Sequence, residues 1–435
     1  MVQGILIIVL FLVIAALMVT RKIPTLLALP VLAIGICIIA GMPLINVVKG
    51  KDTGFLTTVV EAGALKMGAA YMAVIFGSWL GQLLNRTGVT ETIIKKSAEL
   101  GGDSPIVMTL ILVVAVALLF TTLSGLGSII MVGSIVLPIF ISVGIPALSA
   151  GCIFLMAFAT GLAMNISNWQ TFITIFGVSV TQVRNFEIIM MICTLLATVV
   201  LIFVEFKRNG IKFAFSAPLA ESEPEQNGPQ IKGVRGVLAM ITPLIPIILV
   251  AVFKVPILSA FIVGILWILV FTSKSFSKAM NLLTKTCYDG ITDAGPAVIL
   301  MVGIGMLFLS VTSPAVKAVL APIMSVVVPR NAVAFVLFFV LLAPLALYRG
   351  PLNLFGLGSG IAALIVSMKV LPTPAVMGAF LSVERMQGVG DPTNTQNVWT
   401  ANYVGIDVNS ITKKLIPYLW AITAVGVICS ALMFF

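Results

Sequence analysis

The chain has 435 residues, of which 60% are hydrophobic and only 9% charged, and its formal net charge is +10. Because a soluble domain carries about 25% charged residues, this composition excludes a soluble globular protein and predicts an integral membrane protein. The sequence contains no histidine, which excludes a Ser-His-Asp triad, a Cys-His pair, histidine-ligated zinc and a histidine proton relay.

The cysteines and the basic residues point to no further chemistry. The five cysteines lie far apart and show no metal-ligand spacing and no disulfide framework, so we expect packing roles, no metal site and no cofactor. The basic residues are spread over short loops, as the positive-inside rule expects, which predicts contact with a lipid bilayer and no nucleic-acid partner.

Apolar stretches begin at the amino end. The first, Gly4 to Thr20, has no basic segment before it and no cleavage site after it, which predicts a retained span and not a signal peptide. The pattern then predicts a span over Ile23–Ala40, a polar amphipathic connection over Met42–Glu61, a glycine-rich span over Ala62–Leu84 and a short amphipathic piece over Thr87–Leu100.

Two apolar arms follow around a glycine turn. They cover Pro105–Phe120 and Ser128–Val143, and the turn is Thr121–Gly127. Each arm is shorter than the roughly 20 residues that a span needs. The pattern favours a re-entrant hairpin, with two full spans as the alternative.

The first half ends with a broken helix and a last span. The apolar stretch Ala147–Met164 runs into the polar segment Asn165–Thr171, and the last span is predicted over Glu187–Phe206. Irregular polar backbone at membrane depth is tolerated only where it is buried in protein or lines a cavity. The first break is therefore a candidate binding site.

One hydrophilic stretch, Lys207–Arg235, divides the chain. It is too poor in apolar residues to pack a core, so we predict a first transmembrane repeat over residues 1–206, a cytoplasmic linker over 207–235 and a second repeat over 236–435.

The second half repeats the plan of the first. Its predicted elements are spans over Val237–Phe253 and Pro256–Thr272, a connection over Ser273–Asp293, a glycine-rich span over Ala294–Thr312, a short piece over Pro314–Val328, hairpin arms over Ala332–Leu347 and Asn353–Met368 around Tyr348–Pro351, and a last span over Lys414–Phe435. This internal repeat is about 200 residues long. Five crossings per half make the repeats inverted, because five is odd.

A second break, Gly388–Asn397, follows the apolar stretch Thr373–Val383. Two breaks in corresponding positions of two halves are the best sequence pointer to a transporter's binding site. The predicted fold class is an all-α integral membrane protein with two inverted repeats of about five transmembrane helices, each with a re-entrant hairpin and a broken helix.

The layout resembles the ion transporter superfamily of carboxylate carriers. Within it, the chain resembles gluconate:proton symporter (GntP-type) permeases and related citrate carriers, through Gly41-Met-Pro43, Gly390-Asp-Pro392, Trp399 with Tyr403, and the amphiphilic helix from Ser410. The resemblance implies transport of a carboxylate and no enzymatic activity.

Arg349 at the second hairpin tip is the main candidate for substrate contact. An arginine at membrane depth is costly unless it is paired or faces water, and its planar fork suits a carboxylate. The alternatives are a structural pair with Asp391 or Glu384, or snorkelling to an interface. Asn353 follows it and offers a further donor.

Asp391 is the main candidate for ion coupling, since it lies where half-helix ends and open carbonyls can hold a proton or Na⁺. The alternative is a helix N-cap, and both roles can hold together. Thr393 beside it and Glu384, which precedes Arg385, complete the predicted ion-coupling set. Glu384 either faces the cavity or marks the helix end.

Neutral polar residues at the tips and breaks complete the predicted substrate site. Half of them are expected to touch substrate or ion, and the others to bond one another in unwound backbone. They are Ser124, Gly125, Asn165, Ser167, Asn168, Asn394, Thr395 and Asn397.

The sequence therefore predicts a symporter for a small organic anion in the cytoplasmic or inner membrane, coupled to H⁺ or Na⁺. The alternatives are a channel, an ATPase-linked permease subunit and an amino-acid carrier. Whether the chain forms a homodimer stays open.

Overall fold

The computed structural model describes residues 2–48, 50–102, 104–211, 233–273 and 275–435. Within these ranges, seven helices are long and apolar enough to cross a membrane, or up to nine if each bent pair is one span. Strand structure in the described ranges is limited to the two-residue pair β1 (Val47–Val48) and β2 (Lys51–Asp52). The chain is a multi-pass helical membrane protein.

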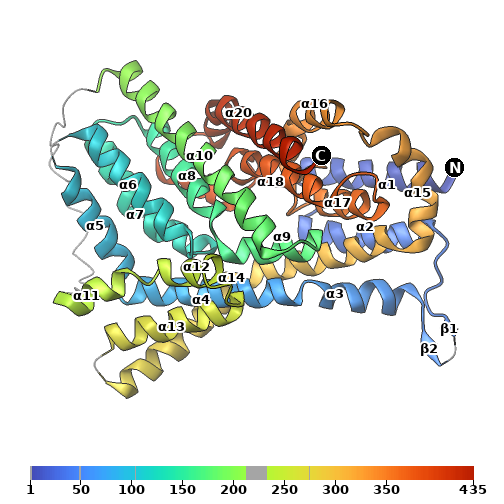
Figure 1. Cartoon of the computed structure of the whole chain (residues 1–435), viewed down its shortest axis with the longest axis horizontal. Coiled ribbons are helices and arrows are strands. Elements are labelled where there is room, and N and C mark those ends of the chain that lie inside the picture. The colour runs from blue at the N-terminus through green and yellow to red at the C-terminus, as the bar shows by residue number, and fades with distance from the viewer. Residues whose placement is uncertain (1, 49, 103, 212–232, 274) are drawn as a thin grey trace.

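The first half follows the predicted order (Figure 1). Its further elements are α1 (Val2–Val19), α2 (Thr25–Ile39), the π-helix η1 (Leu56–Glu61), α3 (Ala62–Lys66), α4 (Gly68–Arg86), α5 (Val89–Gly101), α6 (Pro105–Phe120), α7 (Gly125–Ser142), α8 (Ala147–Ala163), α9 (Ile166–Phe176) and α10 (Val180–Asn209).

The ends of α10 show how local sequence sets these bounds. Ser179 and Gln182 form a reciprocal capping box at its start. Gly210, with φ +63°, ends it in the left-handed conformation that glycine adopts without strain.

The second half contains α11 (Gly233–Met240), α12 (Leu244–Ala251), α13 (Ile257–Thr272), α14 (Phe276–Thr312), α15 (Pro314–Val327), α16 (Ala332–Leu342), the 3-10 helix η2 (Ala343–Arg349), α17 (Gly358–Met368), α18 (Thr373–Gly390), α19 (Thr395–Tyr403) and α20 (Val408–Phe434). The predicted span Val237–Phe253 is the pair α11 and α12, bent by 51°.

The two predicted amphipathic connections were partly wrong. Residues 56–61 join α3 and α4 in one rod, Leu56–Arg86, and α14 runs unbroken for 37 residues through Pro296. Parts of these segments pack closely on other helices, although several of their polar residues stay exposed. Small residues permit the contact: a Cβ on Gly290 would lie 2.7 Å from Trp79 Cα, and one on Gly63 would lie 2.6 Å from Met306 Cα.

The hairpins agree closely with the predicted arms. The first is α6 and α7 around residues 121–124, and the second is α16 with η2, a tip over residues 350–357, and α17. The second returning arm begins at Gly358, later than the predicted Asn353, because Asn353 bonds within the tip.

Both breaks are shorter than predicted. The first consists of Met164 and Asn165, between α8 and α9, which bend by 59°. The second covers residues 391–394, because α18 continues to Gly390 and α19 begins at Thr395. Most of the polar residues in the predicted breaks therefore cap or begin short helices.

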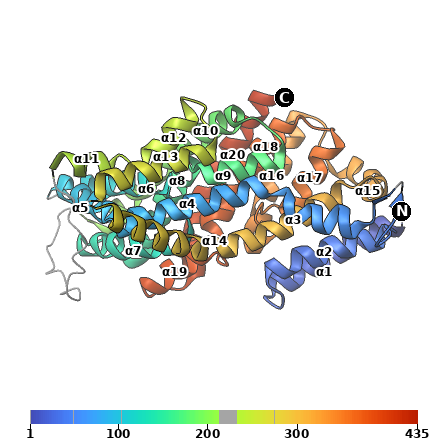
Figure 2. The same cartoon turned by 90° about the horizontal axis from the view of Figure 1, so that it is seen from below.

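Short helices from each half pack on the hairpin of the other half. The short helix α9 packs on α17 of the second hairpin, and α19 packs on α7 of the first. Trp399 of α19 lies against Gly133, and Tyr403 Oη donates to the Ser134 carbonyl (3.2 Å). The long helices α4 and α14, one from each half, run side by side (Figures 1 and 2).

The predicted fold class is confirmed: a helical membrane protein of two repeats, each with a hairpin and a broken helix. The domain boundaries stay a prediction. The first and last residues of the predicted 207–235 linker are helical, in α10 and α11, and residues 212–232 lie outside the described residues.

Candidate functional site

Asp391 joins the second break to the second hairpin. The residue is 0% exposed. Its Oδ2 accepts the backbone N–H of Arg349 (2.9 Å) and Asn353 Nδ2 (3.4 Å). Its Oδ1 accepts the backbone N–H and the hydroxyl of Thr393 (2.8 and 2.7 Å). Four donors thus converge on one carboxylate, an arrangement that holds the tip to the break.

Arg349 contacts Asp391 through its backbone. Tyr348 and Arg349 have φ of +56° and +58°, so the chain turns sharply there and presents the Arg349 N–H to the acid. The half-buried guanidinium donates from Nη1 to the Phe355 carbonyl (3.2 Å), and the described residues show no ion pair between the Arg349 and Asp391 side chains. The Phe355 carbonyl, a neutral acceptor, therefore holds the Arg349 guanidinium at the tip.

The second hairpin tip and the second break together form the second junction. Its other polar residues bind mainly backbone groups. Asn353 donates to the Ala346 carbonyl (3.1 Å), and Asn394 donates to the Gln387 carbonyl (2.5 Å). Asn397 donates to the Asp391 carbonyl (2.8 Å), but its buried Oδ1 has no partner in the described part of the chain. Thr395, the first residue of α19, is exposed.

Asn165 ties the first hairpin tip to the first break, which together form the first junction. It donates hydrogen bonds to the tip, whereas Asp391 accepts them. Its Nδ2 donates to the carbonyls of Phe120 and Leu123 at the end of α6 (3.0 and 3.1 Å). Its Oδ1 accepts the backbone N–H groups of Ser167 and Asn168, which caps α9. The Ser167 hydroxyl donates to the Ala73 carbonyl (3.0 Å) on α4.

The two breaks share a sequence pattern that the analysis of spans missed. Asn165-x-Ser-Asn-x-Gln matches Asp391-x-Thr-Asn-x-Gln: the Asn and Gln positions are identical, the third position is a hydroxyl residue in both, and the first changes from an amide to an acid. Aligning the two polar segments directly would have found it. The pattern places Asn165 and Asp391 in equivalent positions.

Asp293 of α14 is a site residue that sequence reasoning missed. Its Oδ1 accepts the Gly127 N–H (3.1 Å) in the first turn of α7, and its Oδ2 lies 3.4 Å from the Ser78 hydroxyl. Gly125 (φ +84°) leaves the space that the carboxylate occupies. Ser124, the residue before α7, is half-buried, and the buried Ser128 hydroxyl has no hydrogen-bond partner within the described ranges. An acid beside Gly295-Pro296 in an apolar stretch was the available signal.

Glu384 does not lie at the hairpin tip. It pairs with Arg385, and Arg385 Nη2 also lies 3.5 Å from Glu187 Oε1 of α10. Thr393 contacts Asp391 as stated above. The predicted ion-coupling residues therefore fall into two separate groups, and Glu187 was missed because only the fold brings it beside α18.

Comparison with known proteins identifies the fold. The crystal structure of the Alcanivorax borkumensis YdaH transporter, whose topology is described as unusual, is similar to this chain with a TM-score of 0.57 and 12% identity. The match covers 99% of this chain and 97% of that one. The chain thus shares the helical membrane fold of that protein.

Sequence comparison adds no family. No protein-family model matches the chain, and no curated protein matches it. The resemblance to gluconate and citrate carriers therefore stays a prediction, as does the absence of enzymatic activity, with which a transporter neighbour agrees.

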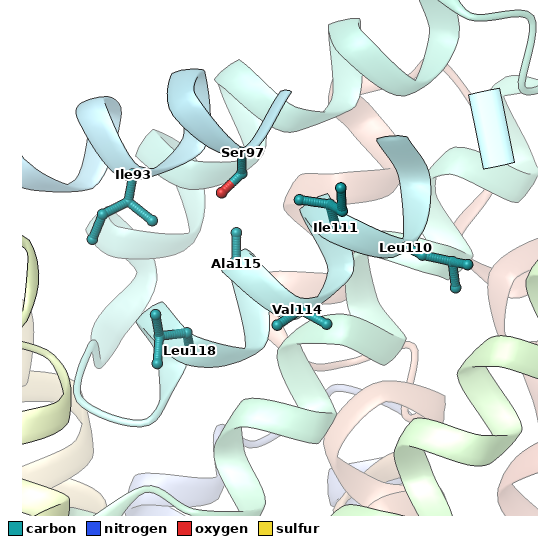
Figure 3. Close-up of a pocket in the computed structure, with 7 residues that line it drawn as sticks. All are labelled: Ile93, Ser97, Leu110, Ile111, Val114, Ala115 and Leu118. Atoms are coloured by element: carbon teal, nitrogen blue, oxygen red, sulfur yellow. The ribbon is translucent and has the colours of Figure 1, made fainter. Parts of the chain in front are cut away.

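Two cavities in the described part of the chain are apolar and lie away from the junctions. One, of about 330 Å³, is a groove between α5 and α6 whose polar lining residue is Ser97 (Figure 3). The other, of about 140 Å³, lies among α1, α2, α14, α15 and α17. Neither lining suits a charged substrate, so the polar junctions remain the candidate site.

Proposed function

We propose that this chain is a secondary active transporter that moves a small organic anion across the cytoplasmic membrane in symport with H⁺ or Na⁺. Gluconate, citrate or a related carboxylate is the proposed substrate class, following the resemblance to gluconate and citrate permeases.

The observation that carries the proposal is the pair of matched junctions. In each half, one side chain, Asn165 or Asp391, ties a hairpin tip to a helix break. Packing of α9 on α17 and of α19 on α7 connects the two junctions. Broken helices in inverted repeats are the usual setting of a transporter's substrate and ion sites, and a simple pore has no need of them.

Several features favour an anion. The helices α7, α9, α17 and α19 all begin at a tip or a break, and helix N-termini attract negative charge. The Arg349 guanidinium lies at the second tip. The Ser128 hydroxyl and the Asn397 side-chain carbonyl oxygen are buried without a partner among the described residues, which leaves them available to a polar ligand.

The test is transport by purified protein in proteoliposomes. Gluconate, citrate, lactate, C4-dicarboxylates and amino acids would each be offered with and without a sodium gradient and a pH gradient. Accumulation of one carboxylate against its gradient, with saturable counterflow, is the expected result. Flux without saturation or counterflow would favour a channel, and no flux of any tested anion would contradict the proposal.

A further inference from the structure

A fully buried charge cluster lies about two helical turns before the second break. Glu187, Glu384 and Arg385 are 0%, 3% and 1% exposed. Arg385 pairs closely with Glu384, and its Nη2 lies 3.5 Å from Glu187 Oε1. Its Nη1 donates to the Ala159 carbonyl of α8 (3.0 Å). Three helices, α8, α10 and α18, therefore meet at one arginine.

The charges of this cluster do not balance. Two carboxylates and one guanidinium sum to −1 when all are ionised. Glu187 Oε2 and Arg385 Nε are buried and have no hydrogen-bond partner among the residues that the structure describes. An unpaired charge away from water is strongly destabilising, and such charges inside membrane proteins usually serve ion or proton pathways.

Neighbouring charged groups do not supply the missing partner. Asp391 is bonded to Arg349 and Thr393 at the hairpin tip. Lys414 of α20 pairs with Glu205 (2.5 Å), near the other end of α10. Within the described residues, the charged groups acting on Glu187 are Arg385 and Glu384.

We propose that Glu187 binds the coupling proton, while Glu384 and Arg385 remain a permanent ion pair. The inference rests on the proposed symport and specifies its ion. Glu187 is the acid with the longer contact to Arg385 and the unpartnered oxygen. Proton binding turns its carboxylate into a carboxylic acid and cancels the excess charge, and release reverses this without any other bond change.

The chemistry of the cluster favours a proton over Na⁺. A hard cation needs several oxygen ligands. Here one unpartnered carboxylate oxygen lies beside a guanidinium whose Nε–H also lacks an acceptor, and this positive charge repels a metal ion. A proton needs only the single oxygen.

The position of the cluster offers a route for coupling. Glu384 lies four residues before Gly388, and a Cβ on Gly388 would lie 3.5 Å from Glu384 Oε1. The Gly388 carbonyl accepts Asn394 and Gln396 from across the break, and Gln387 accepts the Leu354 N–H of the hairpin tip. A change of charge at Glu187 thus acts on the turn of α18 that holds both the tip and the break.

The main test is Glu187→Gln in proteoliposomes, which keeps the size of the side chain and fixes its charge at zero. Substrate counterflow at equal pH should persist, while accumulation driven by an inward proton gradient should fall by about tenfold or more. Glu205→Gln is the matched control, a buried glutamate of the same helix with a lysine partner, and should keep the proton drive. Glu187→Asp should retain coupling with a shifted pH profile.

Three outcomes would overturn the assignment: proton-driven accumulation by Glu187→Gln, an equal loss in Glu205→Gln, or a wild-type protein driven by sodium and indifferent to pH. Infrared spectroscopy of the purified protein tests the same group without transport. The protonated-carboxyl band should weaken in Glu187→Gln and not in Glu205→Gln, and an unchanged band would contradict the proposal. If no anion is transported, the proposed function fails while the spectroscopic result still stands.

Discussion

The two junctions share a plan and differ in charge. At the first, a neutral amide, Asn165, donates to two carbonyls at the end of α6. At the second, an acid, Asp391, accepts from the backbone at the end of η2 and from Asn353. Asn165 and Asp391 occupy equivalent positions, and each ties a hairpin tip to a break. Asn165 does so as a hydrogen-bond donor and Asp391 as an acceptor.

The two halves also differ in the charged residues that they contribute near the junctions. Arg349, Asp391, Glu384 and Arg385 all belong to the second half, while Glu187 of the buried cluster comes from the first. The acid at the first hairpin, Asp293, also comes from the second half, through α14. The comparison indicates that the first half supplies a mainly neutral counterpart, whereas the second half supplies most of the ionic chemistry.

The largest effect is expected from Asp391→Asn. The amide keeps one acceptor oxygen and turns an N–H₂ group toward the donors of either Arg349 or Thr393, so one side of the junction loses its acceptor. Concentrative uptake should fall by about hundredfold, in line with roughly 3 kcal/mol for a buried charged hydrogen-bond partner. Uptake and counterflow in proteoliposomes measure it, and some exchange should survive. Normal accumulation would reduce Asp391 to a dispensable helix cap.

Asn165→Asp tests the same comparison in the first half. The acid keeps the cap on α9 but cannot donate to both the Phe120 and Leu123 carbonyls. Leaving such buried groups unsatisfied should cost about 2 kcal/mol, seen as a lower unfolding temperature in detergent and about thirtyfold slower uptake. Asn165→Gln, which retains the donor, is the control. If Asn165→Asp had the uptake and unfolding temperature of the wild type, hydrogen-bond donation by Asn165 would not be what distinguishes the two junctions.

The fold was accessible from the sequence because its signals are local. Apolar length defined most spans, and Pro105–Phe120 was predicted to the residue because Pro105 starts α6 and the polar residues after Phe120 end it. The breaks were predicted too long, since Ser167 and Asn394 resemble loop residues yet cap or begin short helices. Pro296 did not end α14, because packing along α4 overrides one lost backbone hydrogen bond.

The site was less accessible because it depends on contacts between distant segments. A pair of Arg349 with Asp391 was one alternative from their positions at a tip and a break, and the two do lie together, through the Arg349 backbone N–H. Glu187 lies in an ordinary apolar span, and only the packing of α10 against α18 brings it to Arg385. Whether the selected residues bind substrate or ion stays a prediction.

Arg349→Lys is expected to have a moderate effect. The backbone contact to Asp391 survives, because any side chain leaves the N–H in place, but the bidentate fork is lost. The apparent affinity for a carboxylate should fall by about tenfold. Concentration-dependent uptake measures it, with Lys369→Arg as a control outside the tip. An unchanged KM would remove the guanidinium from the substrate site.

Asp52→Asn should have the smallest effect. It tests whether an acid that accepts backbone N–H groups is important for transport even where it is not buried at a break. Asp52 lies at the β1–β2 hairpin and, like Asp391, accepts two backbone N–H groups and a threonine hydroxyl, from Asn46, Gly54 and Thr57 (2.9, 2.8 and 2.8 Å).

These hydrogen bonds, first the one from Asn46, hold the pKa of Asp52 below its ordinary value. Its contribution to stability is therefore fully present above the unfolded pKa of about 3.9 and is lost as the pH falls through the lower folded pKa. Water replaces the lost bonds at this exposed turn, so the substitution should leave uptake unchanged and shift the unfolding temperature slightly at neutral pH and less at acidic pH. A loss of transport as large as that of Asp391→Asn would show that the acid's burial at the break is not what makes Asp391 important.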